Sequence, residues 1–264
     1  MAKLTADQQA LKSRFLDGLG YWKRVWENLL LADAGFFKGF LDMSVLPYRT
    51  GVLDVKVKEF IYIAIDSGTT HLYDPGLRVH LRRALEVGAS MAEIVEVLEI
   101  TSAVGMHSLT VGLPIVMEEL AAAGKPVPDR DETVLDDRQQ ALKAEFEAAL
   151  GQWNDAWQTL LVMDPDYFEA ALDFQAAPGR SGHLDPKTRE LVSVAANASC
   201  TQLHEPAIRH HVRRAIALGA TGEELLEVLE LISVLGVHTV AVGLPSLLDE
   251  EAGHLERQAA AKAG

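Results

Sequence analysis

The chain has 264 residues, of which 48% are hydrophobic, and a formal net charge of −14. This negative charge argues against a nucleic-acid partner, because phosphate binding needs clustered Lys and Arg side chains. The sequence shows no signal-peptide region and no evident apolar run of about 18 residues, so we expect a cytoplasmic protein without a membrane partner. The single cysteine, Cys200, excludes a disulfide or a two-cysteine redox pair within one chain.

The first part of the chain is predicted to be helical. Apolar side chains recur at spacings of three and four over residues 5–32, where Trp22 and Trp26 are interpreted as part of a core stripe. A second helix is expected to start after Asp54 as its N-cap. Because this helix is apolar on nearly all sides, it is predicted to be central and buried, with Glu59 in its first turn.

A loop at residues 67–74 then leads to a helix over 75–87 that carries His80. Asp74 is the expected N-cap, followed by a first-turn proline, and Gly88 is the expected C-terminal glycine. A capping box, Ser-x-x-Glu at residues 90–93, starts the next helix, which is predicted to reach about residue 106. Its glutamates are placed mostly on a face away from the apolar one.

This series occurs twice. Residues 71–115 and 202–246 are identical at 21 of 45 positions without a gap, so an offset of 131 relates two tandem repeats. No convincing strand pattern is present, and the fold class is predicted to be all-α. We expect a first repeat at residues 1–122, a charged Pro-containing linker at 123–132, a second repeat at 133–250 and a flexible tail at 251–264.

The order of these motifs resembles the carboxymuconolactone decarboxylase family, which shares its fold with the alkylhydroperoxidase AhpD. The motifs are a Glu-led apolar helix, a loop, a helix bearing His, then Arg-Arg-Ala-Leu, Gly-Ala-Ser and a Glu-rich helix that ends in Gly-x-His. The resemblance implies an AhpD-like helical domain that assembles into rings. For a chain with two copies it implies a homo-oligomer that is a trimer or a multiple of one.

The AhpD branch uses a Cys-x-x-Cys pair, which this chain lacks. The matching positions hold His71 and Asp74 in the first repeat, and Gln202 and Glu205 in the second. Thiol peroxidase activity is therefore disfavoured. Cys200 stands two residues before the expected place, and we interpret it as a small buried hydrophobic residue.

In the decarboxylase branch, cofactor-free chemistry is ascribed to a histidine that matches His80 and His211. That branch has a Glu four residues earlier, where this chain has Gly76 and Ala207. The resemblance implies, without any cofactor, a decarboxylation or proton transfer on a small carboxylated lactone or enol/carbonyl compound.

Residue chemistry assigns the roles within that reaction. Histidine exchanges protons near neutral pH, a buried Glu of raised pKa can assist it, and arginine can hold a substrate carboxylate. The predicted catalytic residues are Glu59, His71, His80, Glu190, His204 and His211, with His210 as an alternative to His204. The predicted substrate-binding residues are Arg78, Arg82, Arg209 and Arg213. The recurring pair His107 and His238 is interpreted as structural.

Two other functions use the same residues. A metal-dependent enzyme could take its ligands from mixed imidazole and carboxylate sets, although no tight metal signature is present. These sets are His71, Asp74 and His80 in the first repeat, and His204, Glu205, His210 and His211 in the second. A non-catalytic binding or scaffold protein is the other alternative. The active site could also lie in only one repeat or be built from both.

Overall fold

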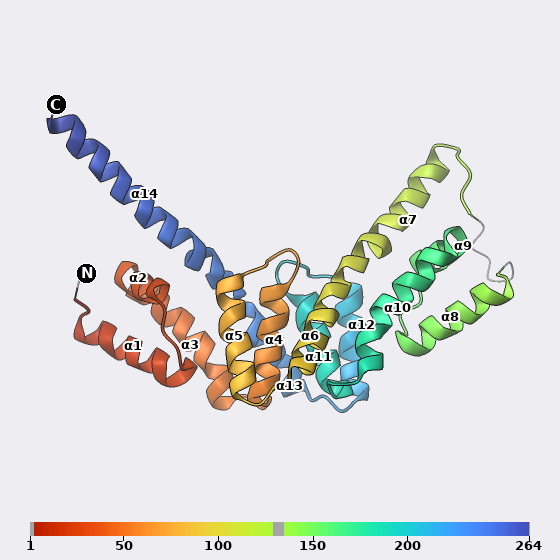
Figure 1. Cartoon of the computed structure of the whole chain (residues 1–264), viewed down its shortest axis with the longest axis horizontal. Helices are drawn as coiled ribbons and strands as arrows, with labels where there is room; N and C mark the ends of the chain where they lie inside the picture. The colour runs from red at the N-terminus through yellow and green to blue at the C-terminus, as the bar shows by residue number, and fades with distance from the viewer. Residues whose placement is uncertain (1–2, 129–134, 264) are drawn as a thin grey trace. The chain divides into compact units, whose positions relative to one another are not determined.

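The computed structural model describes residues 3–128 and 135–263, and these residues form helices and no strand, as the all-α prediction requires (Figure 1). Residues 129–132 of the expected linker lie outside the described residues. The first repeat contributes α1 Ala6–Leu19, α2 Arg24–Ala32, α3 Ala34–Thr50, α4 Val55–Ser67, α5 Asp74–Glu86, α6 Met91–Ser102, the 3-10 helix η1 Ala103–Met106 and α7 His107–Ala122. The second contributes α8 Asp137–Ala149, α9 Asp155–Met163, α10 Pro165–Ser181, α11 Pro186–Ala198, α12 Glu205–Ala217, α13 Gly222–Ser233, η3 Val234–Val237 and α14 His238–Ala263.

Local sequence signals set most helix ends. Ser90 and Thr221 form the predicted capping boxes, and Asp185 accepts a hydrogen bond from the Thr188 amide. Gly88 has a φ of 89°, the left-handed conformation that favours glycine at a helix end. Asp74 is not the N-cap of α5, since the helix already includes it and Tyr73 takes the cap position.

Two predicted helices are shorter than expected. The single helix predicted at residues 5–32 is divided, because Gly20 adopts a φ of 76° and ends α1. The helix predicted to reach residue 106 changes to the tighter 3-10 form after Ser102. Residues 251–262 of the expected tail continue α14 with mostly exposed side chains.

The compact units of the molecule do not follow the repeats. Unit 1 comprises residues 1–58 and 221–264, and unit 2 comprises residues 59–220. In unit 1, α2 and α3 of the first repeat pack against α13, η3 and α14 of the second. In unit 2, α6 of the first repeat packs against α10 and α11 of the second, and α7 packs against α9. Each unit therefore takes helices from both repeats.

A buried glutamate fixes the chain ahead of the central helix of each repeat. In unit 2, Glu96 is fully buried, pairs with Arg189 at 2.8 Å and accepts amide hydrogen bonds from His183 and Leu184. In unit 1, Glu227 pairs with Lys58 at 2.7 Å in the corresponding way. The glutamates of the helix that follows Ser90 were predicted to lie mostly away from its apolar face. This prediction is wrong for Glu96, whose buried charge is satisfied by its partners.

Two helical stretches, residues 91–122 and 222–262, are long and apolar enough to span a membrane by length and composition. This differs from the expectation that no such run exists. Core helices of globular proteins meet the same criteria, so these stretches do not by themselves indicate a membrane protein.

Cys200, expected to be buried, is exposed in the segment after α11.

Candidate active site

A glutamate, a histidine and an arginine come together in the first repeat. Glu59, on α4, is fully buried, and its Oε2 lies 2.8 Å from Nδ1 of His80 on α5. Its Oε1 lies 3.0 Å from Nε of Arg83. The ring of Tyr62 stacks on the His80 imidazole, with centroids 4.3 Å apart. The first-repeat histidine is thus held between a carboxylate and an aromatic ring.

The second repeat has the same arrangement. Glu190, on α11, bridges His211 Nδ1 at 2.8 Å and Arg214 Nε at 2.7 Å. Arg214 also donates to the backbone carbonyl of Leu150 at 3.2 Å. Ser193 occupies the position of Tyr62, and its hydroxyl donates to the Arg189 carbonyl. The second-repeat histidine therefore has no aromatic ring from this position stacked on it.

The protonation state of Glu190 differs from the one expected. Burial alone would raise the pKa of this carboxyl, but hydrogen bonds and charges from His211 and Arg214 outweigh burial and lower the pKa. The prediction of a raised pKa is therefore wrong for Glu190, which is a carboxylate at neutral pH. A carboxylate only accepts hydrogen bonds, so His211 Nδ1 must donate the proton of that bond. The Nε2 atom of a neutral His211 then carries the lone pair.

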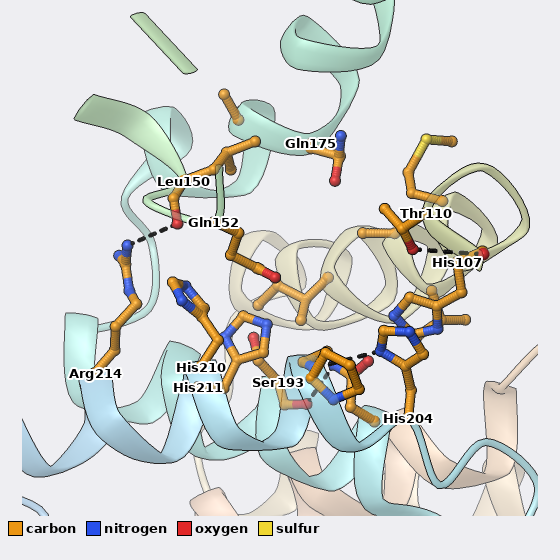
Figure 2. A pocket seen from close by; sticks show the side chains of 18 of the residues that line it. His107, Thr110, Leu150, Gln152, Gln175, Ser193, His204, His210, His211 and Arg214 are labelled. Carbon is orange, nitrogen blue, oxygen red and sulfur yellow. Dashed lines mark hydrogen bonds between the residues drawn. The ribbon is translucent and has the colours of Figure 1, made fainter. Parts of the chain in front are cut away.

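His211, Glu190 and Arg214 line a cavity of about 270 Å³ in unit 2. Both repeats build this cavity, since α6, η1 and α7 of the first repeat supply part of its wall. Figure 2 shows His204, His210 and His211 opposite Leu150, Gln152 and Gln175, with His107 and Thr110 at one side. The apolar part of the wall comprises Ile100, Ala103, Val104, Met106, Val111, Phe146, Ala149, Leu150, Trp157, Ala176, Pro178, Pro206 and Ala207. The site of the second repeat is therefore composite, one of the possibilities that the sequence left open.

His107, interpreted from the sequence as structural, contributes to this wall. Its ring stacks on that of His204, with centroids 3.7 Å apart and an interplanar angle of 13°. Burial, with the nearby charges of His204 and His211, lowers the pKa of His107 to about 4. The recurrence of Gly-x-His in both repeats is the signal that could have marked His107 as a site residue.

The other two predicted histidines of the second repeat also reach the cavity. Nδ1 of His204 accepts the Ala207 amide at 3.3 Å and so caps α12. Burial lowers the pKa of His204. The His210 ring lies edge-on to that of His211, with centroids 5.1 Å apart. Burial, with the positive charges of His211 and Arg214, lowers the pKa of His210 to about 4.

None of the four arginines predicted to bind the substrate lines this cavity. Arg78 pairs with Asp74 at 2.8 Å and Arg209 pairs with Glu205, each on the exposed side of its helix. Arg82 and Arg213 are exposed as well. One position further along, Arg83 and Arg214 contact the buried glutamates, and Arg189 also lines the cavity. Neighbouring residues on a helix point about 100° apart, so only one arginine of each adjacent pair can face the buried glutamate. The Arg-Arg pattern in the sequence does not show which of the two it is.

The predicted metal ligands are held by other contacts. Nδ1 of His80 and of His211 is hydrogen-bonded to a glutamate, and Asp74 and Glu205 are paired with arginines. Among the described residues, neither predicted set brings three ligating atoms within 4.8 Å of one another. His71 is half-buried beside Tyr73, with ring centroids 5.8 Å apart, and burial lowers its pKa.

Comparison with known proteins agrees with the resemblance seen in the sequence. The model of the "Carboxymuconolactone decarboxylase family" matches residues 35–113 and 165–241. The solved structure of a "putative gamma-carboxymuconolactone decarboxylase subunit" from Burkholderia xenovorans LB400 is 39% identical, with a TM-score of 0.86 over 97% of this chain and 100% of that one. No curated protein matches the chain. The chain belongs to the carboxymuconolactone decarboxylase family, as a tandem member with two copies of the domain in one polypeptide.

Proposed function

We propose that the chain is a cofactor-free acid/base enzyme that decarboxylates, or moves a proton on, a small carboxylated lactone or enol/carbonyl compound. The observation that carries the proposal is the position of Glu190, which bridges His211 and Arg214 at the wall of the cavity. A carboxylate on Nδ1 fixes the tautomer of an imidazole and stabilises its protonated form. Family membership supports a decarboxylase-like reaction.

His211 is the proposed proton carrier. In a proton transfer, its neutral Nε2 takes a proton from the carbon next to the substrate carbonyl, and the electron pair of the C–H bond moves into the enolate. The imidazolium, held by Glu190, then returns a proton to another carbon of the same conjugated system. The imidazole ends neutral, and no oxidant or reductant is required.

In a decarboxylation, the histidine acts first as an acid. The bond between the substrate and its carboxylate breaks, carbon dioxide leaves, and the electron pair remains in the substrate as an enolate. Protonated His211 supplies a proton to that carbanion, and a proton from water restores the imidazolium. Arg214 uses only two of its five N–H groups on Glu190 and Leu150, so the remaining groups can hold a substrate anion.

The test compares matched substitutions in the two repeats. Turnover of 4-carboxymuconolactone is followed by NMR for His211→Ala and for its first-repeat counterpart His80→Ala. We expect His211→Ala to lower kcat by at least about 100-fold, the usual contribution of a positioned acid/base group. Glu190→Gln removes the carboxylate and is expected to lower kcat less and to change the pH profile. Wild-type turnover by both histidine variants would refute the role of these residues.

A further inference from the structure

The imidazole of His204 presents a hydrogen-bond donor with a fixed tautomer. Its Nδ1 accepts the Ala207 amide at 3.3 Å, and an amide N–H can only donate, so in the neutral ring the proton is on Nε2. Burial lowers the pKa of His204, and the ring is therefore neutral at neutral pH. No described residue accepts a hydrogen bond from Nε2, and this atom is not fully buried. A ligand in the cavity can therefore accept the Nε2–H hydrogen bond.

Two contacts hold the ring of His204 in place. The bond to the Ala207 amide fixes its Nδ1 edge at the start of α12, and the ring of His107 stacks on its face with centroids 3.7 Å apart. His107 is also uncharged at neutral pH, because its pKa is lowered to about 4. Figure 2 shows the two rings against each other at one side of the cavity. A donor held in this way needs little reorganisation when negative charge develops on a substrate atom.

His204 and His211 lie at opposite ends of one helix face. They are seven residues apart, which is about two turns, so their side chains point the same way from positions about 10 Å apart along the axis of α12. Both side chains line the cavity, and Arg214 lies next to His211 through their shared contact with the Glu190 carboxylate. A small ring compound can thus contact His211 and Arg214 at one end and the His204 Nε2–H at the other. Nε2 of His210 is fully buried and cannot take the role of this donor.

We infer that His204 is a further catalytic residue, whose Nε2–H donates to the substrate carbonyl oxygen and stabilises the enolate. The inference rests on the proposed function, because the enolate arises in the reaction assigned to His211. When the bond to the carboxylate breaks, or when His211 removes a proton from carbon, the electron pair moves through the conjugated system onto the carbonyl oxygen. The His204 proton stays on nitrogen, since a neutral imidazole is a very weak acid, and protonated His211 supplies the proton to carbon.

This role narrows the class of substrate. The carbonyl oxygen must be conjugated with the reacting carbon and must lie at the other end of the molecule from the group that Arg214 binds. The lactone carbonyl of 4-carboxymuconolactone meets the first requirement, because a ring double bond lies between it and the carbon that loses carbon dioxide. The first repeat has Tyr73 at the position of His204, so this imidazole donor belongs to the second repeat.

Two substitutions separate the donor from the helix cap. His204→Asn keeps an acceptor at about the place of Nδ1, since Asn is a favoured N-cap, but removes Nε2. His204→Gln places an amide N–H at about the place of Nε2 and loses the cap. With 4-carboxymuconolactone we expect His204→Asn to lower kcat by about 100-fold and to change KM by less than about threefold, and His204→Gln to lower kcat by less than about 10-fold. A purely structural role would reverse this order. The control His183→Asn, at an exposed histidine of unit 2, should leave kcat unchanged.

A binding measurement tests the hydrogen bond without turnover. The probes are 5-oxotetrahydrofuran-2-acetate and tetrahydrofuran-2-acetate, which share the ring and the carboxylate, whereas only the first has the lactone carbonyl. Dissociation constants for the full chain are obtained by NMR titration. We expect the wild-type protein to bind the first probe about fivefold more tightly, the ratio for one neutral hydrogen bond, and His204→Asn to bind the two within about twofold. Circular dichroism and thermal unfolding check that each variant folds.

Four results overturn the inference: wild-type kcat in His204→Asn, a larger loss of kcat in His204→Gln than in His204→Asn, equal binding of the two probes to the wild-type protein, or no binding of either. The comparison of probes on the wild-type protein needs no variant, so a variant that fails to fold does not protect the inference. Loss of turnover in His211→Ala with normal turnover in His204→Asn would refute the inference and keep the proposed function. Normal turnover by His211→Ala, together with the carbonyl preference and its loss in His204→Asn, would refute the role of His211 and keep His204 as the carbonyl donor.

Discussion

Removal of the Glu96 carboxylate is expected to destabilise unit 2 strongly. The side chain is fully buried, pairs with Arg189 and accepts hydrogen bonds from two backbone amides and the Ser181 hydroxyl. In Glu96→Ala the partly buried guanidinium of Arg189 loses its ion-pair partner, and the amides of His183 and Leu184 lose their hydrogen-bond acceptor. Breaking a buried ion pair from one side costs about 3–5 kcal/mol. For a unit of this size the loss corresponds to a Tm lower by about 6–20 °C.

The assay is urea unfolding at neutral pH, followed by tryptophan fluorescence and circular dichroism. Glu99→Ala, on the same helix but only half-buried, is the control and should change the free energy of unfolding by less than about 0.5 kcal/mol. Glu96→Ala combined with Arg189→Met should cost less than Glu96→Ala alone, because no unpaired charge remains. A loss below about 1 kcal/mol in Glu96→Ala would refute the reasoning.

Three further predictions concern pH, backbone strain and assembly. Because the folded pKa values of His107 and His210 are depressed to about 4, we expect stability to fall as pH drops from about 6.5 towards 4, and urea titrations of His107→Asn and His210→Asn should show a weaker fall. Leu203 has a φ of 47°, so Leu203→Gly should raise the free energy of unfolding by up to about 1 kcal/mol, as should Leu72→Gly at the corresponding position. The proposed trimer, or a multiple of it, is checked by light scattering. Substitution of exposed Val111 and Ile115 on α7 by Asp should yield smaller species if these side chains lie in the interface.

Each of these three has a result that contradicts it. Parallel pH curves for wild-type protein and both histidine variants would show that the two imidazoles do not titrate differently on folding. A lower stability of Leu203→Gly would mean that the leucine contributes more by packing than it loses by strain. A monomer in the wild-type protein would end the trimer proposal.

The duplication and the central helices could be predicted because they depend on local signals. The repeat offset of 131 places Glu190 and His211 at the positions of Glu59 and His80. In each repeat the histidine Nδ1 lies 2.8 Å from the glutamate Oε2. A helical pattern led by Glu and followed by a helix bearing His specifies that contact. The fold class needed nothing beyond periodicity and turn residues.

Features that depend on packing were not predicted. α3 contains Gly35, Gly39 and Pro47, which lower helix propensity, and no helix is predicted there from the sequence. Asp33 caps α3, and buried Phe37 and Leu41 hold it in the core, so tertiary contacts outweigh propensity. The burial of Glu96 depends on Arg189, which is 93 residues away, and no local pattern specifies such a partner.

Each compact unit takes helices from both repeats, so fragments that hold one repeat each should not fold alone. In unit 2, Met106, Leu109 and Leu113 of the first repeat pack against the core around Phe146 and Trp157 of the second. A fragment of residues 1–128 would expose one side of this contact, and a fragment of residues 135–264 would expose the other. Neither fragment can bury its apolar surface alone, so we expect both to be largely unfolded or aggregated when produced separately.

Produced together, the two fragments should restore the helical circular dichroism spectrum and copurify, because each compact unit needs helices from both. The matched control is the continuous fragment 54–220, which holds all of unit 2 and the complete α4. It cuts through both repeats, yet we expect it to unfold cooperatively. If fragment 1–128 folds alone and fragment 54–220 does not, the repeats rather than the compact units are the folding units. His107 lies in the first repeat, whereas Glu190, His211 and Arg214 lie in the second. His107 therefore joins their cavity only when the helices of the two repeats have packed together.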